Sequence, residues 1–301
     1  MTTLKENLQL EKCKIFFKKI MPSLKWILII SISIIIGGII VFSYINNKSQ
    51  NSSTQDSSVS DFNSSSDDAN CNVQGINIHG SVVTYTSNDS YNDQDKVMYD
   101  QTSADSVLYY IDNAQNKDNI KAIVVEVDSG GGSPVAGEEI SNAIKNSSKP
   151  VVAYIRDVGA SAAYWAISGA DRIFASKNSN VGSIGVTQSY LSNVGKNQKD
   201  GYTYIELTSG KYKDTGSPDK VLTDEEKSLL QRDINIMYNN FVADVAQNRG
   251  ITVKVVKSFA DGSTVLGAKA KSLGMIDEVG GLPEVEKYLE TKIGEKPNIC
   301  W

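Results

Sequence analysis

Residues 122–127 (AIVVEV) form a nearly continuous run of β-branched apolar side chains, which is typical of a strand covered on both faces. A glycine-rich turn (DSGGG, 128–132) follows, and Ser133-Pro134 then predicts the start of a helix, because serine caps helices and proline fits the first turn. A second apolar run, residues 151–155, leads through another turn to a predicted helix at Ser161. Strands that alternate with helices at this spacing predict an α/β fold with a mostly parallel sheet.

The rest of the chain between residues 73 and 291 continues this pattern. Further strands are predicted over residues 73–78, 172–175 and 202–207. Residues 81–86 are either a continuation of the first strand or its hairpin partner. A helix is predicted over residues 103–115. A long amphipathic helix is predicted to begin with a capping box at Thr223 and to end near Arg249. Three shorter helices are predicted at 252–260, 267–272 and 283–291.

Residues 26–45 are uncharged and rich in isoleucine. At about 1.5 Å per residue, a helix of this length crosses the roughly 30 Å hydrocarbon core of a bilayer. A cleaved signal peptide is the alternative, but its apolar segment would be shorter, and no small-residue cleavage site closes this segment before residue 43. We therefore expect a retained transmembrane helix that contacts membrane lipid.

Positive charge is concentrated before this apolar segment. Residues 1–25 contain six lysines and two glutamates, so the positive-inside rule places them in the cytosol. Residues 46–71 are rich in serine, asparagine and aspartate and predict a flexible tether. Residues 72–301 then form an extracytosolic domain. This organisation predicts a single-pass protein of the cell membrane.

Charge and cysteine content limit the partners and cofactors of that domain. Residues 46–301 carry 24 basic and 33 acidic side chains, a net charge of −9. Nucleic acid is not expected as a partner, because its binding depends on cationic side chains that neutralise phosphates. Cys71 and Cys300 flank the domain and could form a disulfide, although two free thiols are equally compatible. No group of residues has the spacing of metal ligands, and we expect neither a metal nor another cofactor.

Ser161 stands at a strand-to-helix turn among small residues (GASAAYW, 159–165). A hydroxyl there lies near the positive end of a helix and can be approached by a substrate backbone, as a nucleophile requires. The same position suits an ordinary helix N-cap. His79, the one histidine of the chain, falls in an early strand and is more typical of a structural residue than of a base. A nucleophilic serine would then need another base, and a lysine in a suitable environment can serve.

Lys213 and the three glycines at 130–132 are further candidates with ordinary alternatives. Lys213 follows a predicted strand in a glycine-bearing loop, but many surface loops have this composition. The glycines could present backbone amides to an oxyanion, or they could form a flexible turn. A phosphate-binding loop is disfavoured because no Gly-Lys-Ser/Thr follows them.

Five motifs occur in order along the chain: DSGGG (128–132), GASAAYW (159–165), GSIGV (182–186), SGKYKDTGSP (209–218) and ADGSTVLGAKAKSLGMIDEVGGL (260–282). Together they resemble the signal peptide peptidase A family of membrane-anchored bacterial serine peptidases, and the resemblance covers about residues 73–291. It implies a Clp-protease/crotonase-like fold and an endopeptidase with a Ser-Lys dyad. The expected substrates are remnant signal peptides and other small or unfolded peptides at the outer face of the cytoplasmic membrane.

The resemblance also implies a role for each site residue. Ser161 corresponds to the nucleophile, Lys213 to the general base and Ser183 to the residue that orients the lysine. Gly132 and Ala162 correspond to the donors of the two oxyanion-hole amides. Family members form homo-oligomeric rings in which the serine of one protomer meets the lysine of its neighbour, and the same assembly is expected here.

The chain departs from the family pattern in two places. Gly130 replaces a usual proline, which should loosen the glycine loop, and Ala162-Ala163 replace a usual Gly-Gly, which could narrow the approach of substrate. A non-catalytic membrane scaffold of the same fold is therefore the alternative function. An acyl-CoA enzyme of the crotonase type is disfavoured, because it would need neither Ser161 nor Lys213 and would find no CoA outside the cytosol.

Overall fold

The computed structural model describes residues 71–86 and 100–301. The expected cytosolic segment (1–25), transmembrane helix (26–45) and tether (46–71) lie outside the described residues, apart from Cys71. Among the helices that are described, none has the length and apolar character that crossing a membrane requires.

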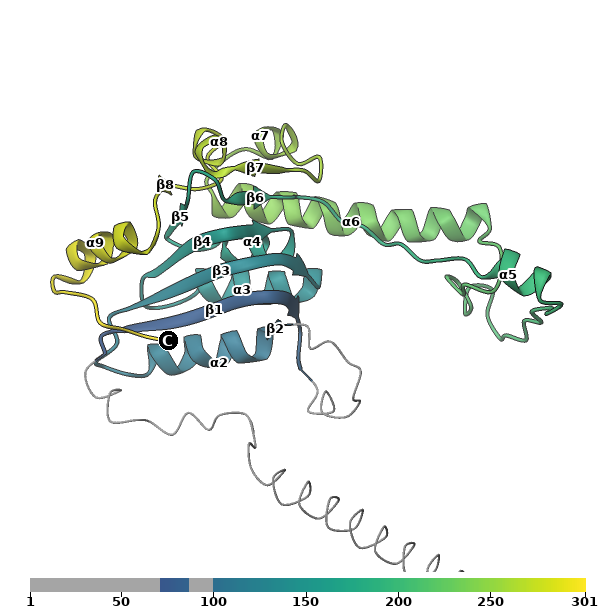
Figure 1. Ribbon diagram of the computed structural model, residues 1–301, viewed down its shortest axis with the longest axis horizontal. Coiled ribbons are helices and arrows are strands. Elements are labelled where there is room, and N and C mark those ends of the chain that lie inside the picture. The colour runs from purple at the N-terminus through teal and green to yellow at the C-terminus, as the bar shows by residue number, and fades with distance from the viewer. Residues whose placement is uncertain (1–70, 87–99) are drawn as a thin grey trace, which may run out of the picture. The chain divides into compact units, whose positions relative to one another are not determined.

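A mostly parallel sheet organises the described domain (Figure 1), which confirms the predicted α/β architecture. Its main path runs β2-β1-β3-β4-β5-β8. Two short strands, β6 and β7, lie off this main path. β6 pairs in parallel with the end of β4, and β7 pairs antiparallel with β6. The strands are β1 (Val73–Val83), β2 (Gln101–Ser103), β3 (Ala122–Gly132), β4 (Val151–Ala160), β5 (Arg172–Ala175), β6 (Asn180–Gly182), β7 (Thr264–Leu266), β8 (Glu278–Val279) and β9 (Ile299–Cys300).

Helices cover both faces of this sheet (Figure 1). One face of the sheet packs on α2, α3 and α4, and their apolar side chains form the larger hydrophobic core. The other face of the sheet packs on α9 and forms a smaller hydrophobic core. The strand at 122–127 serves both cores, as predicted, since Ile123 and Val125 point into the larger and Val124 into the smaller. The helices are α2 (Ala104–Gln115), α3 (Pro134–Lys145), α4 (Ala162–Ile167), α5 (Val194–Lys199), α6 (Asp224–Asn248), α7 (Val253–Lys257), α8 (Gly267–Ser272) and α9 (Leu282–Ile293).

The predicted capping residues begin their helices as expected. Ser133 accepts a hydrogen bond from the amide of Ala136 at the start of α3. At the start of α6 the Thr223 hydroxyl accepts from the Glu226 amide, and the Glu226 carboxylate accepts from the Thr223 amide. The backbone amide of Thr223 and the ammonium group of Lys220 hold the pKa of Glu226 down at about 2. Glu226 therefore remains ionised at neutral pH and secures the first turn of the long helix.

Residues 202–207 are not a strand, contrary to the prediction from their alternating pattern. They run without a ladder partner among the described strands, and both their aromatic and their aliphatic side chains are exposed. A strand needs an edge to pair with, and this segment lies beyond the sheet near α5 (Figure 1). Residues 81–83, by contrast, continue β1, which decides against a hairpin at that point.

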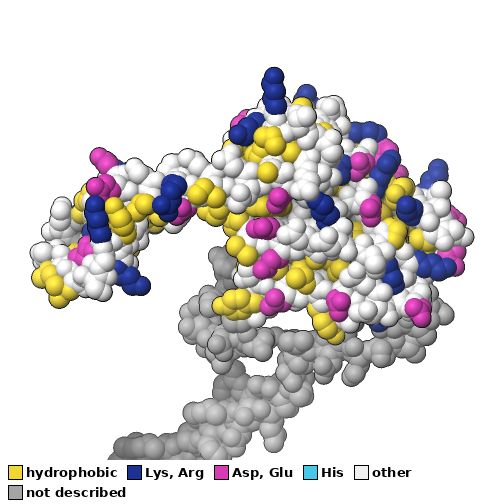
Figure 2. Space-filling model, turned by 180° about the vertical axis from the view of Figure 1, so that it is seen from behind, with side chains coloured by type: hydrophobic (Ala, Val, Ile, Leu, Met, Phe, Trp, Pro, Cys, Tyr) yellow, Lys and Arg dark blue, Asp and Glu magenta, His cyan; other side chains and the backbone are white. Residues whose placement is uncertain are grey.

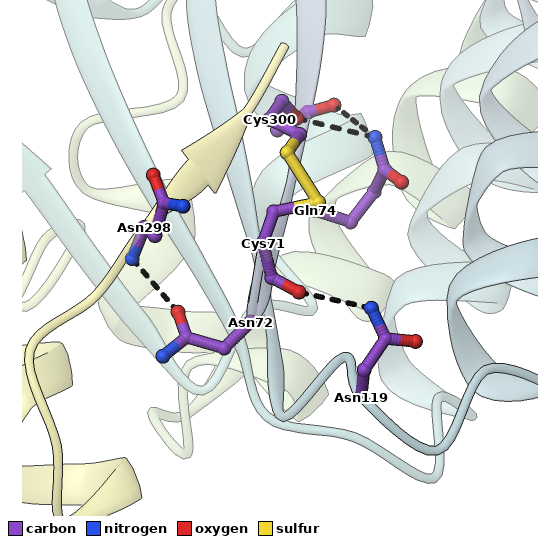
Figure 3. The surroundings of a disulfide bond; sticks show 7 residues. Cys71, Asn72, Gln74, Asn119, Asn298 and Cys300 are labelled. Atoms are coloured by element: carbon purple, nitrogen blue, oxygen red, sulfur yellow. Dashed lines mark hydrogen bonds between the residues drawn. A yellow bond between two sulfur atoms is a disulfide. The ribbon is translucent and has the colours of Figure 1, made fainter. Parts of the chain in front are cut away.

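A disulfide joins Cys71 to Cys300, with Cα atoms 5.9 Å apart (Figure 3). It ties β9 to the start of β1, where the two strands pair in parallel. Polar side chains reinforce the junction, because the amide of Asn298 donates to Asn72 at 2.7 Å and the Asn119 side chain donates to the Cys71 carbonyl at 3.0 Å. Of the two alternatives that the sequence left open, the structure contains the bridged form.

Replacing both Cys71 and Cys300 by serine should lower the free energy of unfolding by about 2–4 kcal/mol, because a long loop is no longer closed in the unfolded chain. For a domain of this size that corresponds to a fall in Tm of roughly 5–15 °C, measured by thermal unfolding. Reductant should lower the Tm of the wild type similarly and leave that of the double variant unchanged. Cys13→Ser is the matched control, and equal Tm values for the double variant and the wild type would contradict the prediction.

Candidate active site

A pocket of about 510 Å³ opens beside Ser161. Its walls come from the end of β3 at Gly132, the loop after β6 at residues 183–187, the turn at 260–262 and the middle of α6. Three of the predicted site residues line it together: Ser161, Ser183 and Gly132. Lys213 does not line it, and neither does Ala162.

Ser161 adopts a backbone conformation that is rare for any residue except glycine, with φ 53° and ψ −129°. Among the described residues only Ser183, with φ 49°, shares a positive φ without being glycine. Such strain is found mainly at functional sites, and here both strained serines line one pocket. Ser161 precedes α4, but its side chain makes no capping hydrogen bond. Its hydroxyl is therefore not used as the ordinary N-cap that the sequence also allowed.

The turn at Ser161 is held from both sides. The Ser161 amide donates to the carbonyl of Gly182 in β6 at 2.7 Å, and its carbonyl accepts from Trp165 at 2.9 Å. Trp165 in turn stacks on Phe241 of α6, with ring centroids 4.5 Å apart, and donates from its indole nitrogen to Asp244. The short buried helix α4 thus fixes the serine between β6 and the long helix α6.

The glycine loop lies directly against this turn. At Gly131, where φ is +100°, a Cβ atom would lie 2.7 Å from the Cβ of Ser161 and 2.8 Å from the amide nitrogen of Ala162. At Gly132 a Cβ would lie 2.0 Å from the carbonyl oxygen of Val82 in β1. Only glycine permits both approaches. The loop is not a flexible turn, because β3 extends through Gly132 and pairs with β1 there.

Ser183 is held by the turn at residues 260–263. Its hydroxyl donates to the carbonyl of Gly262 at 2.8 Å, and its amide donates to the carbonyl of Ser263 at 3.0 Å. The carboxylate of Asp261 accepts from both the amide and the hydroxyl of Ser263, which shapes this turn. Ser183 therefore presents a fixed hydroxyl on the pocket wall.

Lys213 lies in a turn that packs against the beginning of α6. Its amide donates to Gly210, and the neighbouring Tyr212 and Thr215 hydroxyls donate to Glu225 and Glu226. The pocket is lined by α6 residues from Gln231 onward, which is six residues, or about 9 Å along the helix, beyond the Glu225 that Tyr212 contacts. Within one chain, the structure does not bring the predicted serine and lysine together in the pocket.

Lys220, which the sequence did not single out, organises the segment around Lys213. Its ammonium lies 3.0 Å from carboxylate oxygens of both Glu226 and Glu206 and 3.8 Å from Asp214. The hydrogen bonds to Glu226 and Glu206 raise the pKa of Lys220. Sequence reasoning had no signal for this cluster, because its members look like scattered surface charges. Lys213, in contrast, is exposed and forms no ion pair with any residue that the structure describes.

The Ala162-Ala163 pair does not narrow the pocket. Both side chains are buried and neither lines the pocket. The Ala162 side chain is accommodated by Gly137 of α3, where a Cβ atom would lie 3.2 Å from that of Ala162. The glycine at 137 therefore provides the space for an alanine after the serine. This removes the main support that the sequence offered for a non-catalytic scaffold.

His79 does not line the serine pocket, and its side chain contacts Glu126 of β3. Its Nε2 lies 3.0 Å from the Glu126 carboxylate, which also accepts from Arg156 at 2.8 Å and from Tyr154. The contacts of His79 agree with the structural role that the sequence suggested.

Much of the chain is similar in sequence to known proteins. Residues 143–295 match peptidase family S49. The chain is 37% identical over 205 residues to a putative protease of Methanocaldococcus jannaschii, covering 66% of this chain and 65% of that protein. It is 32% identical over 184 residues to a putative signal peptide peptidase SppA of Enterococcus faecium, covering 60% and 54%. The chain thus spans less than two thirds of either relative. In a solved structure of a ClpP1 mutant from Listeria monocytogenes, the alignment covers 70% of this chain and 92% of the ClpP1 chain, with 15% sequence identity and a TM-score of 0.45.

Proposed function

Because the chain belongs to peptidase family S49, we propose that it is a serine endopeptidase with Ser161 as its nucleophile. The observation that carries the proposal is the strained turn at Ser161, which places a serine without a capping hydrogen bond on the wall of a pocket and against the glycine loop. The pocket is lined by apolar residues (Ile184, Ile234) and by polar residues such as Gln231 and Asn235, a combination that suits a peptide. Cleaved signal peptides and other small or unfolded peptides are the proposed substrates.

In the proposed reaction, Ser161 Oγ bonds to the scissile carbonyl carbon while the neutral amine of Lys213 takes the hydroxyl proton. The C–N bond then breaks, the leaving amine receives that proton, and the acyl group remains on the serine. Water attacks the ester in the same way, with its proton passing through the lysine to Ser161 Oγ. The amides of Gly132 and Ala162 donate to the oxyanion, and the Ser183 hydroxyl orients the lysine.

We assign the lysine to a neighbouring protomer of a homo-oligomer. Support comes from the separation of Lys213 from the pocket within one chain and from apolar side chains exposed on the same segment. Leu191 and Leu207 are 88% and 91% exposed, and Figure 2 shows hydrophobic side chains gathered along the projecting part of the domain. Exposed apolar clusters mark interfaces, and a head-to-tail contact that repeats around an axis closes into a ring.

Location at the outer face of the cytoplasmic membrane is part of the same proposal. Its support is the sequence of residues 1–45, with lysines followed by an apolar segment long enough to span a bilayer. The disulfide between Cys71 and Cys300 agrees with an oxidising compartment, because such bonds are rare in the cytosol.

A fluorophosphonate probe tests the proposed nucleophile directly. The full-length protein in detergent should acquire one covalent adduct, which peptide mapping by mass spectrometry should locate at Ser161. The Ser161→Ala variant should remain unlabelled under the same conditions. Complete resistance of the wild type, under conditions that label another peptidase of the same family, would favour the non-catalytic scaffold instead.

A further inference from the structure

Ser129 is a buried polar residue at the start of the glycine loop, with only 2% of its surface exposed. Its hydroxyl donates to the carbonyl of Gly80 at 2.6 Å and accepts from the amide of Gly131 at 3.0 Å. One hydroxyl therefore connects β1 to the glycine that lies against Ser161 and Ala162. No step of the proposed reaction uses Ser129.

Ser129 lies where the sheet becomes irregular on both sides of β3. The pairing of β1 with β3 shifts register between His79 and Ser81, and the pairing of β3 with β4 shifts between Val127 and Ser129. Such shifts take backbone groups out of the regular ladder, and buried backbone groups need replacement partners. The Ser129 hydroxyl supplies a donor to Gly80 and an acceptor to Gly131, which holds the end of β3 in place across the irregularity.

We propose that Ser129 is a positioning residue of the oxyanion hole. Its hydroxyl holds Gly131 in the left-handed conformation, and Gly131 in turn sets the spacing between the Gly132 amide and the Ser161-Ala162 turn. The inference rests on the proposed peptidase function. It assigns a role in that site to a residue that touches neither the substrate nor the reacting atoms.

The composition of the loop explains why this contact carries the positioning. Three consecutive glycines have no side chains to restrict them, and glycine loses more conformational freedom on ordering than any other residue. A Cβ atom at Gly130 would have no heavy atom within 4 Å, so a small side chain at that position would not restrain the loop either. The ladder with β1 pairs Gly131 with Ser81, and the hydroxyl of Ser129 adds a side-chain hydrogen bond that restrains Gly131 from within the loop.

Kinetics of Ser129→Ala give the first test. Losing a preorganised oxyanion donor lowers the rate of chemistry, so kcat should fall about 10–100-fold while KM stays within about twofold. Ser141→Ala is the matched control, because Ser141 lies in α3, is also 2% exposed, and accepts a hydrogen bond from Asn248 of α6. The control should retain kcat within about twofold. An unchanged kcat in Ser129→Ala, or a change in KM alone, would overturn the proposal.

Binding measurements separate positioning from general damage. A peptide boronate forms a tetrahedral adduct that occupies the oxyanion hole, and its affinity should fall about 10–100-fold in Ser129→Ala. Uncleaved peptide should bind equally to Ser161→Ala and to the Ser129→Ala/Ser161→Ala double variant. A merely structural role would weaken both ligands together, and that result would count against the proposal.

Amide exchange tests the contact without any need for activity. Exchange of the Gly131 amide with deuterium should accelerate at least about tenfold in Ser129→Ala and remain unchanged in Ser141→Ala, because only the first variant loses its hydrogen-bond acceptor. Identical exchange rates of the Gly131 amide in wild type and Ser129→Ala would show that the Ser129 hydroxyl does not restrain Gly131. If wild-type protein hydrolyses no peptide, the proposed function fails, while the exchange measurement still decides the role of Ser129 in holding the loop.

Discussion

Replacing Ser161 by alanine is expected to lower kcat/KM for peptide hydrolysis by roughly 10³-fold or more, because no other group can form the acyl intermediate. Stability should change little. The Ser161 side chain makes no capping hydrogen bond, so the loss of about 0.5–2 kcal/mol that usually follows the removal of an N-cap should not occur. Peptide turnover and thermal unfolding of the purified variant measure the two effects.

Ser103→Ala is an informative control, because Ser103 is a true N-cap. Its hydroxyl accepts from the Ser106 amide at 3.2 Å at the start of α2, and it does not line the pocket. This variant should lose stability and keep its activity, the reverse of Ser161→Ala. Ser161→Ala protein that retained more than about a tenth of wild-type turnover would show that another residue is the nucleophile.

Mixed oligomers of Ser161→Ala and Lys213→Ala chains should regain activity that neither variant has alone. If the dyad is shared between neighbours, an active site forms wherever a wild-type serine meets a wild-type lysine across an interface. With equal amounts and random assembly in a head-to-tail ring, that is about one quarter of the sites. Co-expression with two different affinity tags, followed by sequential purification, isolates the mixed oligomers for assay.

A second mixture distinguishes the two arrangements by quantity. Wild-type chains assembled with an equal amount of the Ser161→Ala/Lys213→Ala double variant should keep about one quarter of their sites if the dyad is shared, and about one half if it lies within one chain. Verified mixed oligomers of the two single variants that stay inactive would place the dyad within a chain, and the shared arrangement would be wrong.

The sequence predicts most of the core because its local signals agree with one another. The β-branched run at 122–127, the Ser133-Pro134 start and the capping box at Thr223 each favour one structure, and each is found there. Residues 128–132 show the limit of such signals. Glycine and aspartate are poor strand formers, yet β3 continues through them because β1 offers a paired edge.

Of the site residues predicted from the sequence, Ser161, Ser183 and Gly132 line one pocket, but the geometry of that pocket could not be predicted. The small residues around Ser161 mark the turn, but the positive φ at Ser161 depends on contacts with Gly131 and with the Gly182 carbonyl, which come from distant parts of the chain. The position of Lys213 likewise depends on tertiary contacts, because Lys220 pairs with Glu206 and Glu226 and so holds the segment that contains Lys213. Neither local composition nor periodicity encodes such arrangements.

The bridge between Cys71 and Cys300 also bears on how the domain tolerates proteolysis. The two cysteines are separated by 229 positions, and the long exposed stretch at 187–213 lies between them. A single cut anywhere in that interval leaves the two fragments covalently joined, so a nicked chain can keep its sheet assembled. On a denaturing gel such a chain would migrate as one band without reductant and as two with it. If the proposed ring of peptidase protomers forms, the bridge would keep a protomer that a neighbour has cut in one piece.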